Sequence, residues 1–176
     1  MLAREMNIHS HRHNPVILST HYPVFVMSIE KEIQQSKFRN DYQKAIVNLI
    51  YTYNWVIEKN KQFFEKGDIT MQQYNILRIL RGAGKPLSTL QIRQRMLDKM
   101  SDTSRIVDRL LKKGLVQKVI CETDRRLVDV SISEKGTQLL TEMDQHNSEL
   151  DAILGNLNEE ETKMLNQLLD KIRSTD

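Results

Sequence analysis

Residues 101–112 combine small polar side chains with long cations at a spacing that suits contact with a polyanion. Arg105, Arg109 and Lys112 recur at i, i+4 and i+7, so on a helix they share one face. The segment opens with short hydrogen-bonding side chains beside the free backbone N–H groups of a helix N-terminus: Ser101, Asp102, Thr103 and Ser104. Such a helix can lie in a DNA major groove, with its tip at the base edges and its cations at the phosphates.

A second cationic element follows at Arg125 and Arg126, in the polar stretch ETDRR between two short apolar segments. An Arg on a tight turn can enter a narrow minor groove, where the negative potential is enhanced. Asp124 would repel phosphate, so we interpret it as a partner that positions a guanidinium; a turn-forming Asp is the alternative. Three cations on a helix are by themselves also typical of a solvated face, and the combination with this basic turn favours nucleic acid.

The hydrophobic pattern predicts the elements that position these groups. The residue spacing changes from a period of 3.6 to a period of 2 after Gly114, which predicts helices followed by a β-hairpin. The expected elements are a helix opened by the capping box Thr70–Gln73, a short helix opened by the capping box Ser88–Gln91, a helix at 101–113, and strands at 115–120 and 127–132. This order is that of a helix-turn-helix with a β-wing.

Amphipathic helices are expected on both sides of this unit. A long helix from Asp41 to about Phe64 should bury one apolar stripe, formed by Ile46, Leu49, Ile50, Tyr53 and Ile57. After the hairpin, Ser133 should cap a helix that continues through Ile153, and Asn158 should cap a last helix.

Charge is distributed unevenly along the chain, although the net charge is only +3. Residues 88–126 hold ten Lys and Arg against five Asp and Glu, whereas residues 134–176 hold four against ten. This predicts a polyanion-binding module joined to a segment that need not touch the polyanion. No run approaches the roughly 18 uncharged apolar residues that cross a bilayer, so a membrane-spanning role is not expected.

Signatures of the common enzyme sites are missing from the sequence, which has no Gly-rich phosphate loop, G-x-S-x-G elbow or H-E-x-x-H motif. His9, His11 and His13 alternate but have no evident further metal ligand. We therefore predict no catalytic residue, no cofactor and no metal. Cys121 is the only cysteine, so an intramolecular disulfide is impossible and a reducing cytoplasm is the expected setting; no cation immediately flanks this thiol, which favours a structural role.

The N-terminal region differs from the rest of the chain. Pro15 and Pro23 lie there and no helical period is visible, which predicts a disordered arm over residues 1–38. An ordinary charged sequence begins at Met27, so we expect the biological start to be Met27.

The two basic motifs resemble the signature of the MarR (multiple antibiotic resistance regulator) family of winged-helix transcription factors. The similarity lies in SDTSRIVDRLLKKGLVQK and ETDRRLVDVSISEKG and extends over about residues 40–173. The matching features are Arg105, the run Val107–Leu110, the turn Gly114–Val116, the D-x-R wing of Asp124 and Arg126, and Gly136.

The resemblance implies a homodimer that binds double-stranded DNA through two winged helices at a pseudo-palindromic operator. The expected fold is mainly α with a small β-hairpin, a winged helix-turn-helix with N- and C-terminal dimerisation helices. The expected boundaries are a dimerisation helix at 39–66, a DNA-binding lobe at 67–136 and C-terminal dimerisation helices at 137–176. The apolar stripes and acidic surfaces of the outer helices independently favour a second chain as their partner; packing within one chain is the alternative.

The resemblance also implies a small aromatic effector. A pocket between the lobes would fall near Tyr53, Trp55, Ile57 and Tyr74, although aromatic residues at helical spacing are also typical of a core. The predicted function is a DNA-binding transcription regulator, more specifically a repressor released by an effector. The alternative is a winged-helix protein-interaction module without sequence-specific DNA binding.

Overall fold

The computed structural model describes residues 28–120 and 128–174. The chain divides between Lys37 and Phe38 into two units. In the first unit, α1 (Ile29–Glu32) forms one turn of helix. This helix was not predicted from the sequence and lies inside the segment expected to be a disordered arm.

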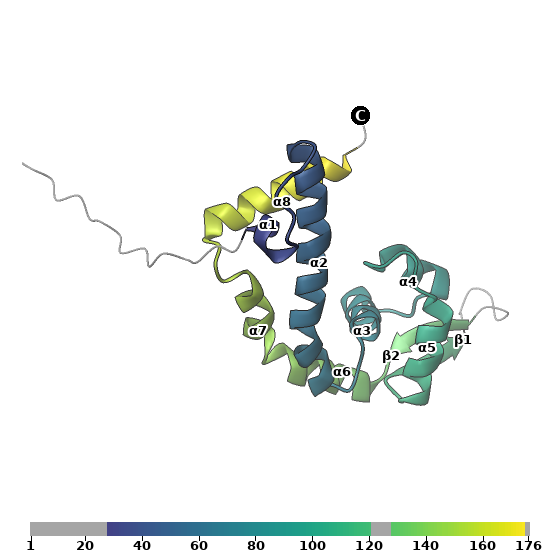
Figure 1. The fold of residues 1–176 in the computed structure, drawn as a ribbon. Helices are drawn as coiled ribbons and strands as arrows, with labels where there is room; N and C mark the ends of the chain where they lie inside the picture. The colour runs from purple at the N-terminus through teal and green to yellow at the C-terminus, as the bar shows by residue number, and fades with distance from the viewer. Residues whose placement is uncertain (1–27, 121–127, 175–176) are drawn as a thin grey trace, which may run out of the picture. The chain divides into compact units, whose positions relative to one another are not determined.

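The second unit is mainly helical with one two-stranded antiparallel sheet, as the sequence predicted (Figure 1). Its elements in chain order are α2 (Asp41–Lys66), α3 (Met71–Ala83), α4 (Thr89–Arg95), α5 (Thr103–Lys112), β1 (Val116–Ile120), β2 (Val128–Ile132), α6 (Glu134–Asp144), α7 (Asn147–Asp151), the 3-10 helix η1 (Ala152–Leu154) and α8 (Glu159–Arg173).

Local capping chemistry sets most helix starts. Thr70 and Ser88 form the predicted capping boxes of α3 and α4. In each box the cap side chain accepts the backbone N–H of the glutamine three residues on, and the side-chain oxygen of that glutamine accepts the backbone N–H of the cap residue. Ser133 and Asn158 cap α6 and α8 as predicted. After α3, Gly84 takes a left-handed conformation with φ of 61°, which ends the helix at little steric cost.

The core lies where α3 packs against α4, α5, α6 and the hairpin. Its fully buried side chains are Ile76, Leu77, Leu80, Leu87, Ile92, Met96, Leu110 and Leu140. The hairpin pairs Val116 with Ile132 and Ile120 with Val128. Leu87 exchanges two backbone hydrogen bonds with Val130, at 3.0 and 2.9 Å, so the α3–α4 loop anchors the hairpin beside the core.

The start of α6 crosses the connection between α5 and β1 at very close range. A Cβ on Gly136 would lie 2.1 Å from the carbonyl oxygen of Leu115, so only glycine fits at this crossing. Ser133 strengthens the junction, because its hydroxyl donates to the carbonyl of Gly114 at 2.7 Å.

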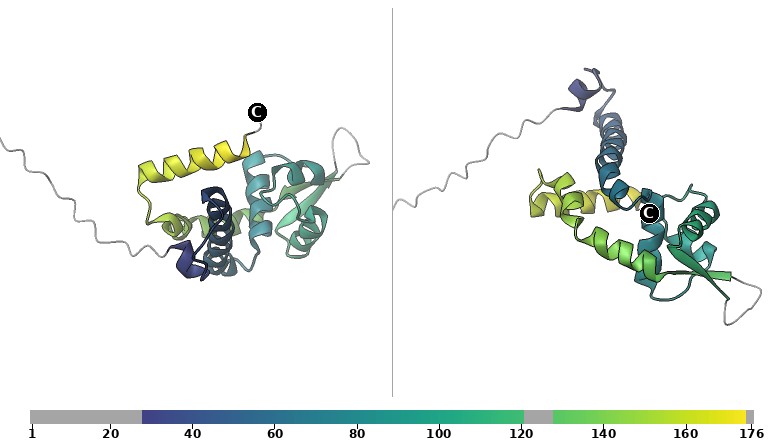
Figure 2. Two further views of the ribbon diagram at one scale, coloured as in Figure 1. Left: turned by 45° about the horizontal axis from the view of Figure 1, so that its top comes forward. Right: turned by 90° about the horizontal axis from the view of Figure 1, so that it is seen from below.

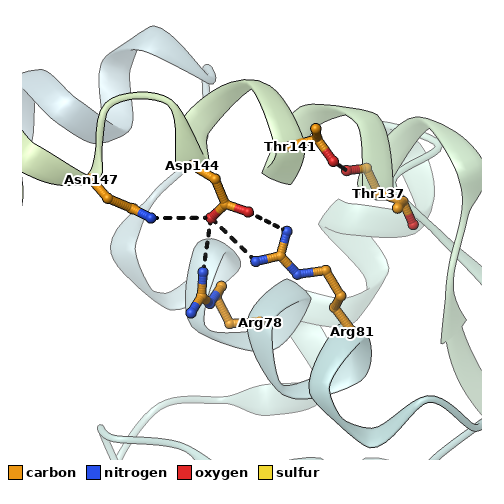
Figure 3. A network of polar contacts seen from close by, with 6 residues as sticks. All are labelled: Arg78, Arg81, Thr137, Thr141, Asp144 and Asn147. Atoms are coloured by element: carbon orange, nitrogen blue, oxygen red, sulfur yellow. Dashed lines mark hydrogen bonds and ion pairs between the residues drawn. The ribbon is translucent and has the colours of Figure 1, made fainter.

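The helix expected to run from Ser133 through Ile153 is broken, which corrects that prediction. It ends at Asp144, and α7 and η1 follow as short separate pieces. Asp144 is held by side chains of α3 and by Asn147, as Figure 3 shows, so distant residues contribute to the local geometry at this break.

The outer helices leave large apolar surfaces exposed in the single chain. The stripe on α2 was expected to be buried, with a second chain as the favoured partner, and in the single chain Ile46, Ile50 and Tyr53 are 59%, 58% and 61% exposed. The buried residues of α2 are Phe63 and Phe64 near its C-terminal end, and α8 buries none. In the left view of Figure 2, α8 (yellow) runs along the edge of the second unit. The apolar stripe of α2 and the apolar side chains of α8 are therefore not covered by this chain's own core.

Within residues 28–120 and 128–174, none of the helices has the length and apolar character needed to cross a bilayer.

Candidate nucleic-acid interface

The expected recognition helix is α5, and it begins two residues later than predicted. Asp102 is its N-cap: one carboxylate oxygen accepts the backbone N–H of Arg105 at 3.1 Å. The other oxygen pairs with the Nε of Arg105, also at 3.1 Å. Asp102 therefore orients the first cation of the helix, and its carboxylate is occupied by α5 itself.

The three predicted cations of α5 are all exposed. Arg105, Arg109 and Lys112 point away from the core, whereas Val107 and Leu110 are buried. One side of α5 is thus anchored in the hydrophobic core while the other presents guanidinium and ammonium groups to solvent, an arrangement that can bind phosphates.

Thr103 is the exception among the predicted contact residues. Its side chain is only 4% exposed and faces the core side of α5, so the expectation that it contacts DNA is wrong. The physical reason is helical spacing: Thr103 precedes Val107 by four residues and Leu110 by seven, which places all three on the buried face. Ser104 is exposed at the tip of the helix and Ser101 is half-buried just before it.

The turn between α4 and α5 is tied down by side chains. Asp98 accepts the N–H of Met100 at 3.0 Å and the hydroxyl of Ser101 at 2.6 Å. The hydroxyl of Ser101, followed by the N–H of Met100, holds the pKa of Asp98 below its usual value. At the start of the turn, the N–H of Leu97 donates to the side-chain oxygen of Asn75 in α3 at 2.9 Å. The approach to α5 therefore has a defined backbone path.

Other exposed cations lie in the same lobe and were not among the predicted contacts. Arg93 and Arg95 occupy the last turn of α4, and Lys118 is an exposed residue of β1. In a helix-turn-helix the helix before the recognition helix crosses the DNA backbone, so cations on α4 suit phosphate contacts. The excess of basic residues over 88–126 was the signal that could have identified them.

The predicted wing tip, Asp124, Arg125 and Arg126, lies outside the described residues, as do Cys121 and the three alternating histidines. The described strands lead up to residue 120 and away from residue 128 in antiparallel register.

Comparisons with known proteins agree with this architecture. Residues 69–128 match the model of the MarR family. The chain is 28% identical over 131 residues to the HTH-type transcriptional regulator MhqR of Bacillus subtilis, covering 73% of this chain and 89% of MhqR. It is 30% identical to the crystal structure of a MarR transcription factor from Planctomyces limnophilus, with a TM-score of 0.58 over 76% of this chain and 98% of that one. The chain belongs to the MarR family.

The fold match also extends to a DNA complex. A cysteine-to-serine mutant of MarR from E. coli, solved with operator DNA, superposes with a TM-score of 0.71 at 21% identity, over 79% of this chain and all of that one. At this identity the match shows the fold, a winged helix-turn-helix. As a member of the MarR family, the chain is a DNA-binding transcription regulator, and the relatives named here are regulators too.

A hollow of about 640 Å³ in this MarR-family chain adjoins the DNA-binding lobe. It is lined by α2, α3, α7, η1 and Leu97, the first residue of the turn before α5. Its wall includes Tyr74, with the guanidinium of Arg78 5.8 Å from the ring centre, and Asn75, which holds the N–H of Leu97. The polar groups of the lining are the guanidinium of Arg78, the carboxylate of Asp151 and the amides of Asn60, Asn75 and Asn147. An apolar wall with a few such groups suits a small ligand that carries a hydrogen-bonding group, and an anionic group would have to lie on the Arg78 side.

The four residues predicted for an effector pocket are not brought together. Tyr74 lines this hollow, whereas Trp55 lines a separate one of about 390 Å³ with Lys59, whose ammonium lies 5.6 Å from the indole centre. Tyr53 belongs to the exposed stripe of α2, and Ile57 is half-buried.

An ionic cluster joins α3 of the DNA-binding lobe to α6 and α7 (Figure 3). Asp144 accepts hydrogen bonds from Arg81 at 2.7 and 3.2 Å and from Arg78 at 2.9 Å. Asn147 adds a contact at 3.5 Å. The bonds from Arg81 are the main reason that the pKa of Asp144 is lowered and that of Arg81 is raised. Arg78 therefore lines the hollow and also belongs to the ionic cluster around Asp144.

Proposed function

We propose that the protein is a repressor that binds a pseudo-palindromic operator as a homodimer and blocks a promoter. The observation that carries the proposal is the exposed cationic face of α5, held by a buried apolar face in a MarR-family lobe. The predicted contacts that keep this role are Ser101, Ser104, Arg105, Arg109 and Lys112, with Arg125 and Arg126 of the predicted wing. Asp102 keeps a positioning role, because its carboxylate binds Arg105. The expected cytoplasmic location belongs to the same proposal.

Dimerisation is supported by the two exposed apolar stripes. On α2 the stripe is formed by Tyr42, Ile46, Leu49, Ile50 and Tyr53, and on α8 by Met164, Leu168 and Ile172. Between them, α2 and α8 expose more large apolar side chains than the scattered ones expected on a monomer, and such surfaces mark interaction sites. A symmetric dimer would place two cationic helices at successive major grooves.

Release by a small effector is supported by the hollow beside the DNA-binding lobe. A ligand there would contact Arg78, which binds Asp144, and Asn75, which holds the turn before α5. We infer that an aromatic or similarly apolar ligand with an anionic group would bind in this hollow and shift the position of α5. Tyr74 and Arg78 are its proposed contacts.

Selection of duplexes from a random pool by the full-length protein tests the DNA proposal. An enriched inverted repeat is the expected result, and its half-site spacing should be near one helical turn of about 10 base pairs. The absence of any enriched sequence would contradict specific DNA binding and favour a protein-interaction module.

The salt dependence of binding to the enriched duplex provides a second test. The logarithm of the association constant should fall against the logarithm of salt concentration, with a slope of about −0.9 for each phosphate contacted. Replacing Arg109 by Ala should make this slope less negative. Lys61→Ala is the matched control, because it removes one positive charge from the exposed surface of α2 and should leave the slope unchanged. Equal slopes for the two variants would contradict the placement of α5 at the DNA.

A further inference from the structure

Met100 is an unusually exposed apolar residue at the tip of the recognition helix. It is 93% exposed, more than any other large hydrophobic side chain in the described part of the chain. We propose that Met100 contacts the C5-methyl group of a thymine in each half of the DNA site and so helps to determine the sequence that the protein prefers. This inference rests on the proposed function.

The backbone that carries Met100 is fixed, which distinguishes it from an exposed residue on a loose loop. Its own N–H donates to Asp98, and the next residue, Ser101, donates its hydroxyl to the same carboxylate. The beginning of the turn is attached to α3 through the bond from Leu97 to Asn75. The methionine side chain therefore starts from a defined position, and a contact made by it costs little backbone entropy.

The position of Met100 along the chain places it at the end of α5 that faces base edges. In a helix-turn-helix, the N-terminal residues of the recognition helix contact the bases. Met100 precedes the N-cap Asp102 by two residues. Because Thr103 is buried in the core and Asp102 is bound to Arg105, fewer groups at this tip remain free for DNA than the sequence suggested. The exposed side chains of Met100 and Ser104 are among those that remain.

The chemistry of methionine favours a thymine methyl over the other groups that DNA presents. Its side chain has no strong hydrogen-bond donor and no charge, so a contact with phosphate gains little. The methyl group of thymine is the apolar group that base pairs expose in the major groove. A flexible, polarisable thioether can adapt its shape to that methyl group.

Substitution of thymine by uracil tests the contact, because uracil keeps the base pair and lacks only the methyl group. In the duplex recovered by random selection, each thymine is replaced in turn and binding to the full-length protein is measured. At one symmetric pair of positions, loss of the methyl groups should weaken binding about fourfold for each half-site, the equivalent of one buried methyl group. Met100→Ala should show no such methyl effect at these positions, whereas Met100→Leu should largely keep it.

The outcomes separate this inference from the proposed function. If the duplex binds but thymine and uracil sites lose the same affinity on Met100→Ala, the proposed contact is refuted while DNA binding stands. If no position responds to the methyl group in the parent protein, the inference also fails. If no duplex is enriched at all, the proposed function fails first. Since Met100 is almost fully exposed, both variants should melt at the temperature of the parent, and a lowered melting temperature would contradict the assignment.

Discussion

Replacing Ile50 by Ala should weaken the proposed homodimer without unfolding the chain. Ile50 is 58% exposed in the middle of the apolar stripe of α2. Complete burial of an isoleucine is worth about 1.5–3 kcal/mol, so burial of the exposed part contributes about 0.9–1.7 kcal/mol for each copy. A symmetric interface counts the residue twice, which gives about 1.7–3.5 kcal/mol and a dissociation constant raised about 20- to 350-fold.

Sedimentation velocity over a range of protein concentrations measures this effect. The parent should stay dimeric at concentrations where Ile50→Ala dissociates, and both should melt as folded proteins. Leu90→Ala is the matched control: Leu90 is 64% exposed, but it lies on α4 in the DNA-binding lobe, so its loss should not change the dissociation constant. A parent that sediments as a monomer at every concentration, or equal dissociation of the two variants, would refute the assignment of the α2 stripe to the dimer interface.

Three further predictions concern the ionic cluster, the buried threonine and the wing. Asp144→Ala should lower the free energy of unfolding by about 1–2 kcal/mol in urea titrations, a value that allows for the partial exposure of the ion pair with Arg81. Asp68→Asn removes the more exposed ion pair with Lys113 and should change the free energy of unfolding little. Since Arg81 lowers the folded pKa of Asp144, this stabilisation is complete above about pH 4 and is lost as the pH falls further, and a loss that instead grew with rising pH would contradict it. Thr103→Val should raise stability by about 1 kcal/mol and keep DNA affinity, because it removes a buried hydroxyl that has no partner among the described residues; weaker DNA binding would restore Thr103 as a contact. Arg126→Ala should weaken binding to the selected duplex by about 1–3 kcal/mol in fluorescence anisotropy, and unchanged affinity would exclude its minor-groove role.

Features set by neighbouring residues were predictable from the sequence. The caps at Thr70, Ser88, Ser133 and Asn158 formed as expected, because a cap needs only a side chain and a backbone N–H a few residues away. The hairpin was predictable for a similar reason, since alternation of apolar residues and a polar turn are local patterns.

The inward position of Thr103 was also within reach of the sequence. The cations of α5 were identified from their i, i+4, i+7 spacing, and Thr103, Val107 and Leu110 have the same spacing two residues earlier. An offset of two residues corresponds to about 200° around a helix, so the two stripes lie on opposite faces. Thr103 was predicted to contact DNA because threonine is polar, although its helical position places it on the buried face.

The break after Asp144 could not be derived in this way, and the periodicity of α2 alone could not decide which chain covers its stripe. Asp144 is held by Arg78 and Arg81, more than sixty residues earlier in the chain, and no local pattern reports such a pair. The apolar period of α2 predicts a buried face, but periodicity is the same whether that face meets its own chain or a second one. The amount of core that the rest of the chain can offer decides between them, and this depends on the tertiary fold.

In the proposed repressor, the same long-range contacts would be the route by which an effector acts on DNA binding. A ligand in the hollow shifts the protein toward release only to the extent that it binds the DNA-free arrangement more tightly than the DNA-bound one. Apolar contacts with side chains that keep the same relative positions in both arrangements would contribute equally to both, so they would not shift the equilibrium between them. Arg78 and Asn75 differ from such walls, because each also holds a second element: the first holds α6 through Asp144, and the second holds the turn that leads into α5. A ligand group that competes for either bond would distinguish the two arrangements, so the inducing part of the effector should be its anionic or amide-binding group and not its apolar body.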